Sequence, residues 1–196
     1  MAIQIANANM TTPIRLLSYF GRAQYEFDNR YLLTASIRQD GSSRFGKNNR
    51  WGIFPAISAA YRISNEKFWP ERFVMNQLKL RASWGLNGNN SIPSNAALGI
   101  ISSANYSVGG GMTNGFAPSS INNENLGWEK TRSWNFGIDI GFFNNRISIS
   151  ADYYNKTTKD LLYQVSIPAS MGFSKAWGNI GSINNKGFEV ELTHRI

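Results

Sequence analysis

The chain has 196 residues, a formal net charge of +8, no cysteine and a single histidine. Without cysteine it can form neither a disulfide nor a thiolate metal site, and one histidine leaves little room for histidine-based metal or catalytic chemistry. With 42% hydrophobic and only 16% charged residues the chain is not expected to be disordered, and its cations are scattered rather than clustered as nucleic-acid binding would require.

Seven segments alternate between apolar and polar residues, which is the pattern of β-strands with two different faces. In chain order they cover approximately residues 16–27, 30–40, 51–63, 77–87, 128–142, 146–157 and 186–195. Asp28-Asn29 and Asn144-Asn145 mark tight turns, because Asx residues favour such positions. We therefore predict an all-β, antiparallel up-and-down meander of about seven long strands. Pro55 should introduce a bulge or an irregular strand, because it cannot donate to a ladder.

The connections between these segments differ in length in a regular way. Those at residues 28–29 and 144–145 are short and that at 64–76 is intermediate, whereas those at 41–50, 88–127 and 159–185 are long. Long and shorter connections then fall at opposite ends of the sheet, as in outer-membrane barrels. The segments also approach the roughly nine to eleven tilted residues that cross a bilayer. We therefore predict a section of a larger transmembrane β-barrel.

The two sets of alternating side chains differ sharply in polarity. No charged residue occurs in the apolar set within residues 17–27, 31–37, 51–63, 78–86, 134–142, 147–153 and 188–192, which indicates a face in contact with lipid. The opposite set should face a hydrated lumen and includes Arg22, Glu26, Arg38, Lys79, Arg81, Asp139 and Asp152. Aromatic residues gather at two levels, as in the interfacial girdles of membrane barrels. Tyr25, Phe27, Tyr31, Tyr61 and Phe142 form the level near the short turns, and Tyr19, Trp51, Trp84, Trp134 and Tyr153 form the other.

Candidate chemistry is sparse. Asp139 and Asp152 could be a general acid and base, but the absence of a nearby histidine favours pore-lining polarity, so we do not expect an enzyme. Residues 38–49 superficially suggest a phosphate-binding loop but lack the GxxxxGK[ST] spacing, and an extracellular hairpin loop is expected instead. The segment at residues 88–127 is the candidate ligand-facing loop, in which Tyr106 and Phe116 could stack on sugar rings; alternatively it only packs on its neighbours.

Four blocks of the sequence resemble the SusC/RagA-type TonB-dependent outer-membrane transporters. They are residues 18–64, 78–92 (LKLRASWGLNGNNSI), 124–162 and 179–192 (NIGSINNKGFEVEL), in the order of the family. The resemblance implies part of the C-terminal half of the family's barrel, with residues 1–15 as a lead-in or partial strand and 16–196 as partial barrel without a plug domain. It also implies the outer membrane of a Gram-negative bacterium, an oligosaccharide or peptide substrate and no cofactor. The partners of the full-length parent would be the lipid bilayer, a SusD-like surface lipoprotein and the TonB complex.

Residues 1–13 lack the basic and apolar regions of a signal peptide, and the last segment stops while still alternating. We therefore expect a piece of a longer protein, which would not transport alone because lipid cannot satisfy two open sheet edges. Two alternatives remain. A soluble or cell-surface carbohydrate-binding β-sandwich would bury the apolar set between two sheets. A small enzyme barrel in the outer membrane would need a histidine or serine constellation that the sequence does not offer.

Overall fold

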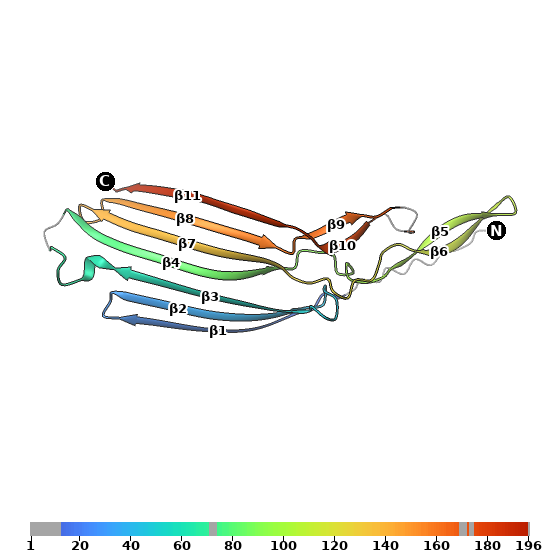
Figure 1. The fold of residues 1–196 in the computed structure, drawn as a ribbon, viewed down its shortest axis with the longest axis horizontal. Helices are drawn as coiled ribbons and strands as arrows, with labels where there is room; N and C mark the ends of the chain where they lie inside the picture. Colours follow the sequence, from blue (N-terminus) through green and yellow to red (C-terminus); the bar gives the residue numbers. More distant parts are fainter. Residues whose placement is uncertain (1–12, 71–73, 169–171, 173–174, 196) are drawn as a thin grey trace.

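Figure 1 shows the computed structural model of the chain, in which seven long strands lie side by side in one sheet. The structure describes residues 13–70, 74–168, 172 and 175–195. The strands are β1 (Leu16–Phe27), β2 (Tyr31–Ser42), β3 (Trp51–Arg62), β4 (Met75–Asn89), β7 (Glu129–Phe142), β8 (Ile147–Lys159) and β11 (Ser182–His194). Each pairs antiparallel with its neighbours in the order β1-β2-β3-β4-β7-β8-β11, which confirms the predicted meander. Residues 1–12 of the predicted lead-in lie outside the described residues.

The two ends of the sheet differ as predicted (Figure 1). At one end, which we call the turn end, two tight turns and residues 63–74, with the 3₁₀ helix Ile63–Asn65, join the strands. At the other, the loop end, the strands are joined by residues 43–50, 90–128 and 160–181.

Both tight turns use left-handed backbone at Asx residues. Asp28 and Asn29 have φ of 50° and 52°, and Asn144 and Asn145 have φ of 57° and 61°. Positive φ at both central residues is the requirement of a type I′ turn, whose twist matches that of the flanking strands. Asparagine and aspartate tolerate this conformation better than other non-glycine residues. These turns therefore fix the β1–β2 and β7–β8 hairpins.

Two further hairpins occupy segments that the sequence predicts as loops. They are β5 (Ile101–Val108) with β6 (Gly111–Pro118), and β9 (Leu162–Ser166) with β10 (Lys175–Asn179). Gly109 and Gly110 make the turn of the first hairpin with φ of 60° and 81°. Figure 1 shows that both hairpins extend beyond the loop end of the sheet.

Pro55 does not cause the predicted bulge. The register between β2 and β3 continues unbroken through the Ile37–Pro55 pair. The irregularity lies on the other side of β3, where the ladder with β4 ends at the Ala56–Gly85 pair, because a proline offers no N–H to continue it. Of the two predicted outcomes, a bulge does not occur, whereas an irregular strand does, because the proline sits at the point where β3 and β4 stop pairing.

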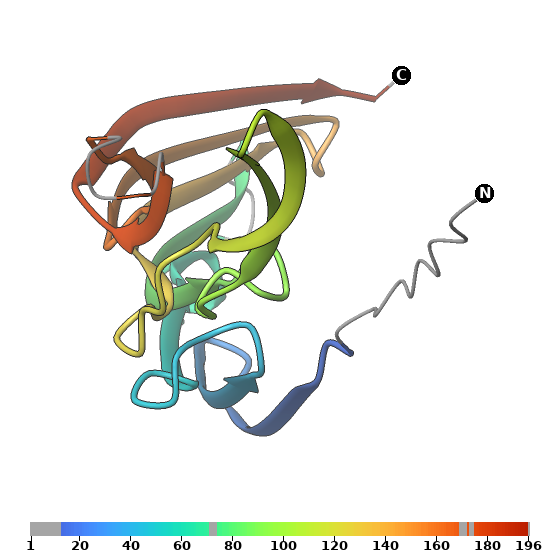
Figure 2. The same ribbon diagram turned by 90° about the vertical axis from the view of Figure 1, so that its right-hand side faces the viewer.

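The sheet is curved, with one polar and one apolar face. Figure 2, which looks onto the loop end, shows the sheet as a trough. A hollow of about 620 Å³ is lined by side chains from β1, β2, β3, β4, β7 and β8, among them Arg22, Ser36, Ser58 and Asn135. Only a concave face can bring side chains from so many strands around one hollow. The polar set therefore lies on the concave side, which we call the inner face, and the apolar set lies on the outer face.

The outer face exposes large apolar side chains. Examples are Tyr25 at 63% exposure, Phe136 at 50% and Phe188 at 81%. Water-soluble monomers rarely expose contiguous apolar surface on this scale. The other sheets in the described part of the chain are the two small hairpins, so no second sheet covers this face, in contrast to the β-sandwich alternative. No helix among the described residues is long and apolar enough to cross a membrane.

Candidate functional site

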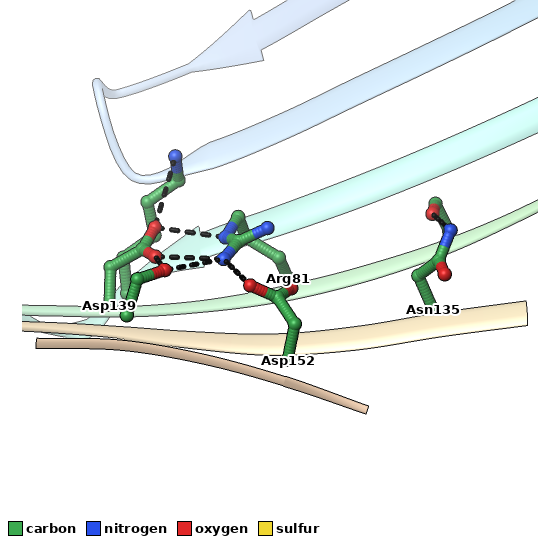
Figure 3. Close-up of polar contacts among 7 residues, drawn as sticks. Arg81, Asn135, Asp139 and Asp152 are labelled. Atoms are coloured by element: carbon green, nitrogen blue, oxygen red, sulfur yellow. Dashed lines mark hydrogen bonds and ion pairs between the residues drawn. The ribbon is translucent and has the colours of Figure 1, made fainter. Parts of the chain in front are cut away.

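An ion-paired network lies on the inner face, where three strands bring together four of the residues predicted to face the lumen. Arg81 of β4 donates from Nε and Nη2 to the two carboxylate oxygens of Asp139 of β7, both at 2.9 Å. The same Nη2 donates to Oδ2 of Asp152 of β8 at 2.9 Å, so the guanidinium lies between the two carboxylates (Figure 3). Nζ of Lys79 lies 3.7 Å from Oδ2 of Asp139. The predicted residues therefore form one network rather than separate polar positions.

Two residues that the sequence analysis did not single out complete this network. The hydroxyl of Ser150 donates to Oδ1 of Asp139 at 2.8 Å and accepts from Nη2 of Arg81 at 3.1 Å. Gly137 leaves the space that the guanidinium occupies, because a Cβ at this position would lie 2.7 Å from Cζ of Arg81. The alternation of polar and apolar residues places Gly137 and Ser150 on the predicted lumen-facing side, but it does not reveal which side chains they contact. We call Lys79, Arg81, Gly137, Asp139, Ser150 and Asp152 together the wall network.

The chemistry of the wall network is that of a neutralised polar surface. Both carboxylates are hydrogen-bonded to Arg81, with side-chain exposures of 24% for Asp139 and 31% for Asp152. A general acid and base pair needs one carboxylate free to carry a proton to a reacting group. The arrangement is a charge-balanced polar surface in which neither carboxylate lacks a hydrogen bond from Arg81.

The remaining predicted lumen residues lie elsewhere on the inner face. Arg22 and Arg38 line the 620 Å³ hollow, toward the loop end from the wall network. Nη2 of Arg38 lies 2.7 Å from Oδ2 of Asp40, a carboxylate that is only 1% exposed. Glu26 is distant from both groups and pairs with Nη1 of Arg62 at 2.9 Å near the turn end.

The 620 Å³ hollow offers groups that suit a hydroxylated or peptide-like solute. Its lining combines guanidinium groups with the ring of Phe20, which is 75% exposed, and with serine and threonine hydroxyls and asparagine amides. Exposed hydroxyls and amides can both donate and accept hydrogen bonds. Its lining includes alternate positions of β2 and β3, namely Thr34, Ser36, Arg38, Phe54, Ala56 and Ser58.

The predicted girdle residues make cross-strand ring contacts on the outer face. Near the turn end, Tyr31 stacks on Tyr61 with ring centroids 4.9 Å apart, and Phe27 lies 6.4 Å from Tyr31. Toward the loop end the pairs are Tyr19–Trp51 at 6.2 Å, Trp84–Trp134 at 6.1 Å and Tyr153–Phe188 at 4.8 Å. Tyr25 is exposed and Phe142, the last residue of β7, is half-buried. Their role at a membrane interface stays a prediction.

At the loop end the connecting segments pack into a small core. Its buried residues are Phe45, Phe54, Ile92, Ala96, Ala97, Leu126 and Trp128. The ring of Trp128 lies 4.9 Å from that of Phe45 and 5.3 Å from that of Phe54, centroid to centroid. Its indole N–H donates to the carbonyl of Arg50 at 3.1 Å. This core joins residues 43–50 to residues 90–128, so these two segments form one packed unit.

Asn179 connects the third loop segment to this unit. Its Oδ1 accepts from the N–H of Gly127 at 2.8 Å, and its Nδ2 donates to the carbonyl of Gly127 at 2.8 Å. The same Nδ2 donates to the carbonyl of Asp160 at 2.9 Å. The amide of Asn179 therefore bonds both the N–H and the carbonyl of Gly127. It also bonds Asp160, at the start of residues 160–181. Sequence alone gives no signal for this role, because the chain is rich in asparagine.

The two aromatic residues of the candidate ligand-facing loop are not brought together. Tyr106 of β5 is 53% exposed and Phe116 of β6 is 82% exposed. The register pairs Tyr106 with Thr113 and Ser103 with Phe116. Since neighbouring positions of a strand point to opposite faces, Tyr106 and Phe116 project from opposite faces of the hairpin. They cannot stack on the two sides of one ligand within this hairpin.

At the turn end, Glu66 ties the β1–β2 turn to the segment after β3. The hydroxyls of Tyr61 and Tyr31 donate to Oε1 at 2.9 and 3.0 Å, and Nη1 of Arg30 donates to Oε2 at 3.0 Å. The hydrogen bond from Tyr61, with those from Tyr31 and Arg30, holds the pKa of Glu66 below its ordinary value of 4.5, although burial opposes the shift. Among the described residues no group of three or more His, Cys, Asp or Glu side chains could hold a metal ion.

Comparisons with known proteins match this geometry. A family model described as "TonB dependent receptor-like, beta-barrel" matches residues 4–195. The TonB-dependent receptor P39 of Formosa agariphila is 45% identical over 90% of this chain, and the TonB-dependent receptor SusC of Bacteroides thetaiotaomicron is 43% identical over 90%. The solved structure of the RagAB peptide transporter superposes with a TM-score of 0.83 at 36% identity, covering 91% of this chain.

The chain spans about a fifth of the length of these proteins: 17% of P39, 18% of SusC and 20% of the RagAB chain. A siderophore receptor, PirA from Pseudomonas aeruginosa, shares only the fold, at 16% identity and a TM-score of 0.59. The single curved sheet, its uncovered apolar face and its sorted connections are those of an open section of such a barrel. The chain therefore belongs to the TonB-dependent receptor β-barrel family and lies in the outer membrane of a Gram-negative bacterium.

Proposed function

We propose that this chain is one section of the barrel wall of a TonB-dependent importer of oligosaccharides or peptides. The observation that carries the proposal is the similarity of nine-tenths of the chain to SusC and to the RagAB peptide transporter. On this proposal the turn end lies in the periplasm and the loop end outside the cell. The full-length parent works with a SusD-like surface lipoprotein and with the TonB complex, as the family resemblance implies.

The inner face supports passage of a polar solute. Its hollow presents hydroxyls, amides and the cations Arg22 and Arg38. The wall network lies beyond it and carries no free carboxylate, because Arg81 bonds both Asp139 and Asp152. We accordingly assign the parent a transport role and no catalytic one.

The section on its own is not competent for transport. β1 and β11 are the edges of the seven-stranded sheet and each pairs with only one neighbour. Unpaired backbone groups at a strand edge cannot be satisfied by hydrocarbon. The missing strands of the parent must therefore cover both edges before the wall encloses a lumen.

A pair of neighbouring substitutions tests this function in the full-length parent. Ser36→Trp places a large ring in the hollow of the inner face, whereas Ala35→Trp places the same ring on the outer face. Uptake of labelled oligosaccharides and labelled peptides is measured in cells that carry each variant, with a strain lacking TonB as the baseline. We expect Ser36→Trp to lower uptake of one solute class at least several-fold, while Ala35→Trp keeps it.

The same cells report whether the parent is an outer-membrane barrel at all. An antibody against residues 40–49 should detect, in unboiled outer-membrane samples, a heat-modifiable band several times heavier than 21.9 kDa. A band of 21.9 kDa in the soluble fraction would contradict the proposal. So would uptake that is unaffected by the loss of TonB.

A further inference from the structure

Charged residues on the two faces of the sheet are sorted by sign. The seven carboxylates of the seven strands all belong to the inner set: Glu26, Asp40, Glu129, Asp139, Asp152, Glu189 and Glu191. The charged residues of the outer set are four cations: Lys130, Arg132, Lys159 and Lys186. All four lie in the loop-end parts of β7, β8 and β11, and all four are exposed. We call them the outer cations.

The register places three of the outer cations close together, whereas Lys186 lies on β11, level with Trp134 and two strands away from β7. Lys130 lies directly opposite Lys159 on the neighbouring strand. Arg132 is two positions along β7 from Lys130, on the same face. Lys186 is opposite Asn155. Opposite side chains on one face have Cβ atoms about 4.5 to 5.5 Å apart, and like charges at that distance oppose strand pairing. Lys130 and Lys159 therefore work against strand pairing unless an anion lies between them, and Arg132 adds to the positive charge beside them.

No carboxylate within the described residues neutralises this cluster. None of the outer cations takes part in the ion pairs of the described structure. Asp160 shares with Lys130 a hollow of about 260 Å³ that Trp51 and Asn179 also line, but the two charges form no ion pair. Between the cations lie uncharged polar groups, and Nδ2 of Asn184 donates to Oδ1 of Asn155 at 2.7 Å.

The height of the cluster points to a lipid headgroup. Two positions further along the strands from Arg132 and Lys186, on the same face, are Trp134 and Phe188, which begin the apolar part of the outer face. Tryptophan and tyrosine prefer the level where the acyl chains of a bilayer meet the headgroups. Lysine and arginine bind phosphate oxygens through charge-assisted hydrogen bonds. At the turn end, in contrast, the outer set of the seven strands carries no Lys, Arg, Asp or Glu.

We propose that Lys130, Arg132, Lys159 and Lys186 form a binding patch for the phosphorylated headgroup of the glycolipid in the outer leaflet of the membrane. The inference rests on the proposed function, which places the loop end outside the cell. The apolar face that continues below the patch favours a lipid over a soluble anion, because the acyl chains lie against Trp134 and Phe188 while the phosphate meets the cations. An acidic protein partner would have to approach this face through the headgroup layer.

Native mass spectrometry of the full-length barrel in neutral detergent tests the patch. The wild-type barrel is incubated with monophosphoryl lipid A or with the same lipid after removal of its phosphate. We expect retention of the phosphorylated form over the dephosphorylated form. A variant with glutamine at all four positions should lose this preference, with affinity falling about five-fold for each cation removed. The control Lys47→Gln/Lys175→Gln removes two loop-end cations outside the patch and should bind as the wild type does.

Equal retention of the two lipids by the wild-type barrel would overturn the proposal, as would full retention by the four-site variant. Displacement of the lipid by an equimolar amount of inorganic phosphate would also overturn it, since the patch would then bind a free anion as tightly as the lipid. Folding is checked by the heat-modifiable band, and the Lys130→Gln/Lys159→Gln variant replaces the four-site variant if the latter does not fold. The proposed function is judged separately by solute uptake, so a barrel that transports but does not select phosphorylated lipid refutes only this inference.

Discussion

Replacing Arg81 with methionine tests whether the wall network stabilises the barrel. The substitution removes three hydrogen bonds of 2.9 Å to carboxylates and leaves Asp139 and Asp152 with only Lys79, 3.7 Å from Asp139, to balance them. Hydrogen bonds to charged groups contribute about 1.5–3 kcal/mol each when buried. Arg81 is 34% exposed, so water replaces part of what is lost. We expect the free energy of unfolding to fall by about 2–3 kcal/mol.

Guanidinium unfolding of the full-length barrel in detergent measures this change through the midpoint and slope of the transition. Arg22→Met is the matched control, because Arg22 also lies on the inner face and forms no ion pair with a described residue. We expect this control to stay within about 0.5 kcal/mol of the wild type. An Asp152→Asn substitution should cost much less in the Arg81→Met background than in the wild type. Equal midpoints for Arg81→Met and wild type, or equal losses for Arg81→Met and Arg22→Met, would refute the reasoning.

Three further predictions concern the two ends of the sheet. Gly46→Ala should destabilise the loop end by about 1–3 kcal/mol, because a Cβ there would overlap the carbonyl of Glu124; unchanged resistance to trypsin would contradict this. Asn179→Asp should raise amide hydrogen exchange in residues 160–181, because a carboxylate cannot donate to the two carbonyls that the amide now serves; unaltered exchange would disprove that role. Glu66, whose pKa is lowered chiefly by its hydrogen bond from Tyr61, should stabilise the turn end fully above pH 4.5 and progressively less as the pH falls through its folded-state pKa. The unfolding midpoints of wild type and Glu66→Gln should therefore converge in acid, and a constant gap would rule this out.

The long strands could be predicted because each of them faces two different media. Lipid on one side and water on the other require strict alternation over the whole crossing. The sequence predicts a strand at residues 16–27, and β1 spans Leu16–Phe27. The last strand is predicted at 186–195 and spans Ser182–His194, so only its first residues, which lie beyond the apolar part, were missed. Alternation weakens where the strand leaves the bilayer, and there the prediction loses accuracy.

The β5–β6 hairpin could not be predicted because it meets the same medium on both faces. Ile101 and Phe116 are 68% and 82% exposed on one face, and Tyr106 and Val108 are 53% and 58% exposed on the other. With both faces exposed, no apolar periodicity distinguishes the strand from a loop. Gly109 and Gly110 are residues that favour a turn, but the residues on either side of them do not alternate between apolar and polar, so the sequence does not predict a hairpin there.

The partners within the wall network depend on register, which alternation does not determine. Alternation places Arg81, Asp139 and Asp152 on the same face. The register then sets Arg81 level with Gly137, and Gly137 level with Asp152, while Lys79 is level with Asp139. The guanidinium therefore crosses an empty glycine position to reach Asp152 and extends diagonally to Asp139. A shift of one pair would remove both contacts, so this network could only be found once the pairing was known.

The position of the buried core reverses the usual relation between strands and loops. In a soluble domain the strands bury apolar side chains and the loops are mobile and tolerant of change. Here Phe188 is 81% exposed in the middle of a strand, whereas Leu126 is fully buried in a connecting segment. The strands are stabilised by their backbone hydrogen bonds and by contact with lipid, whereas the loop end is stabilised by a small buried core. Substitutions in residues 90–128 must therefore be judged as core substitutions. A partner or solute that binds to this packed unit meets segments that are already ordered, so the entropic cost of ordering them does not reduce its affinity.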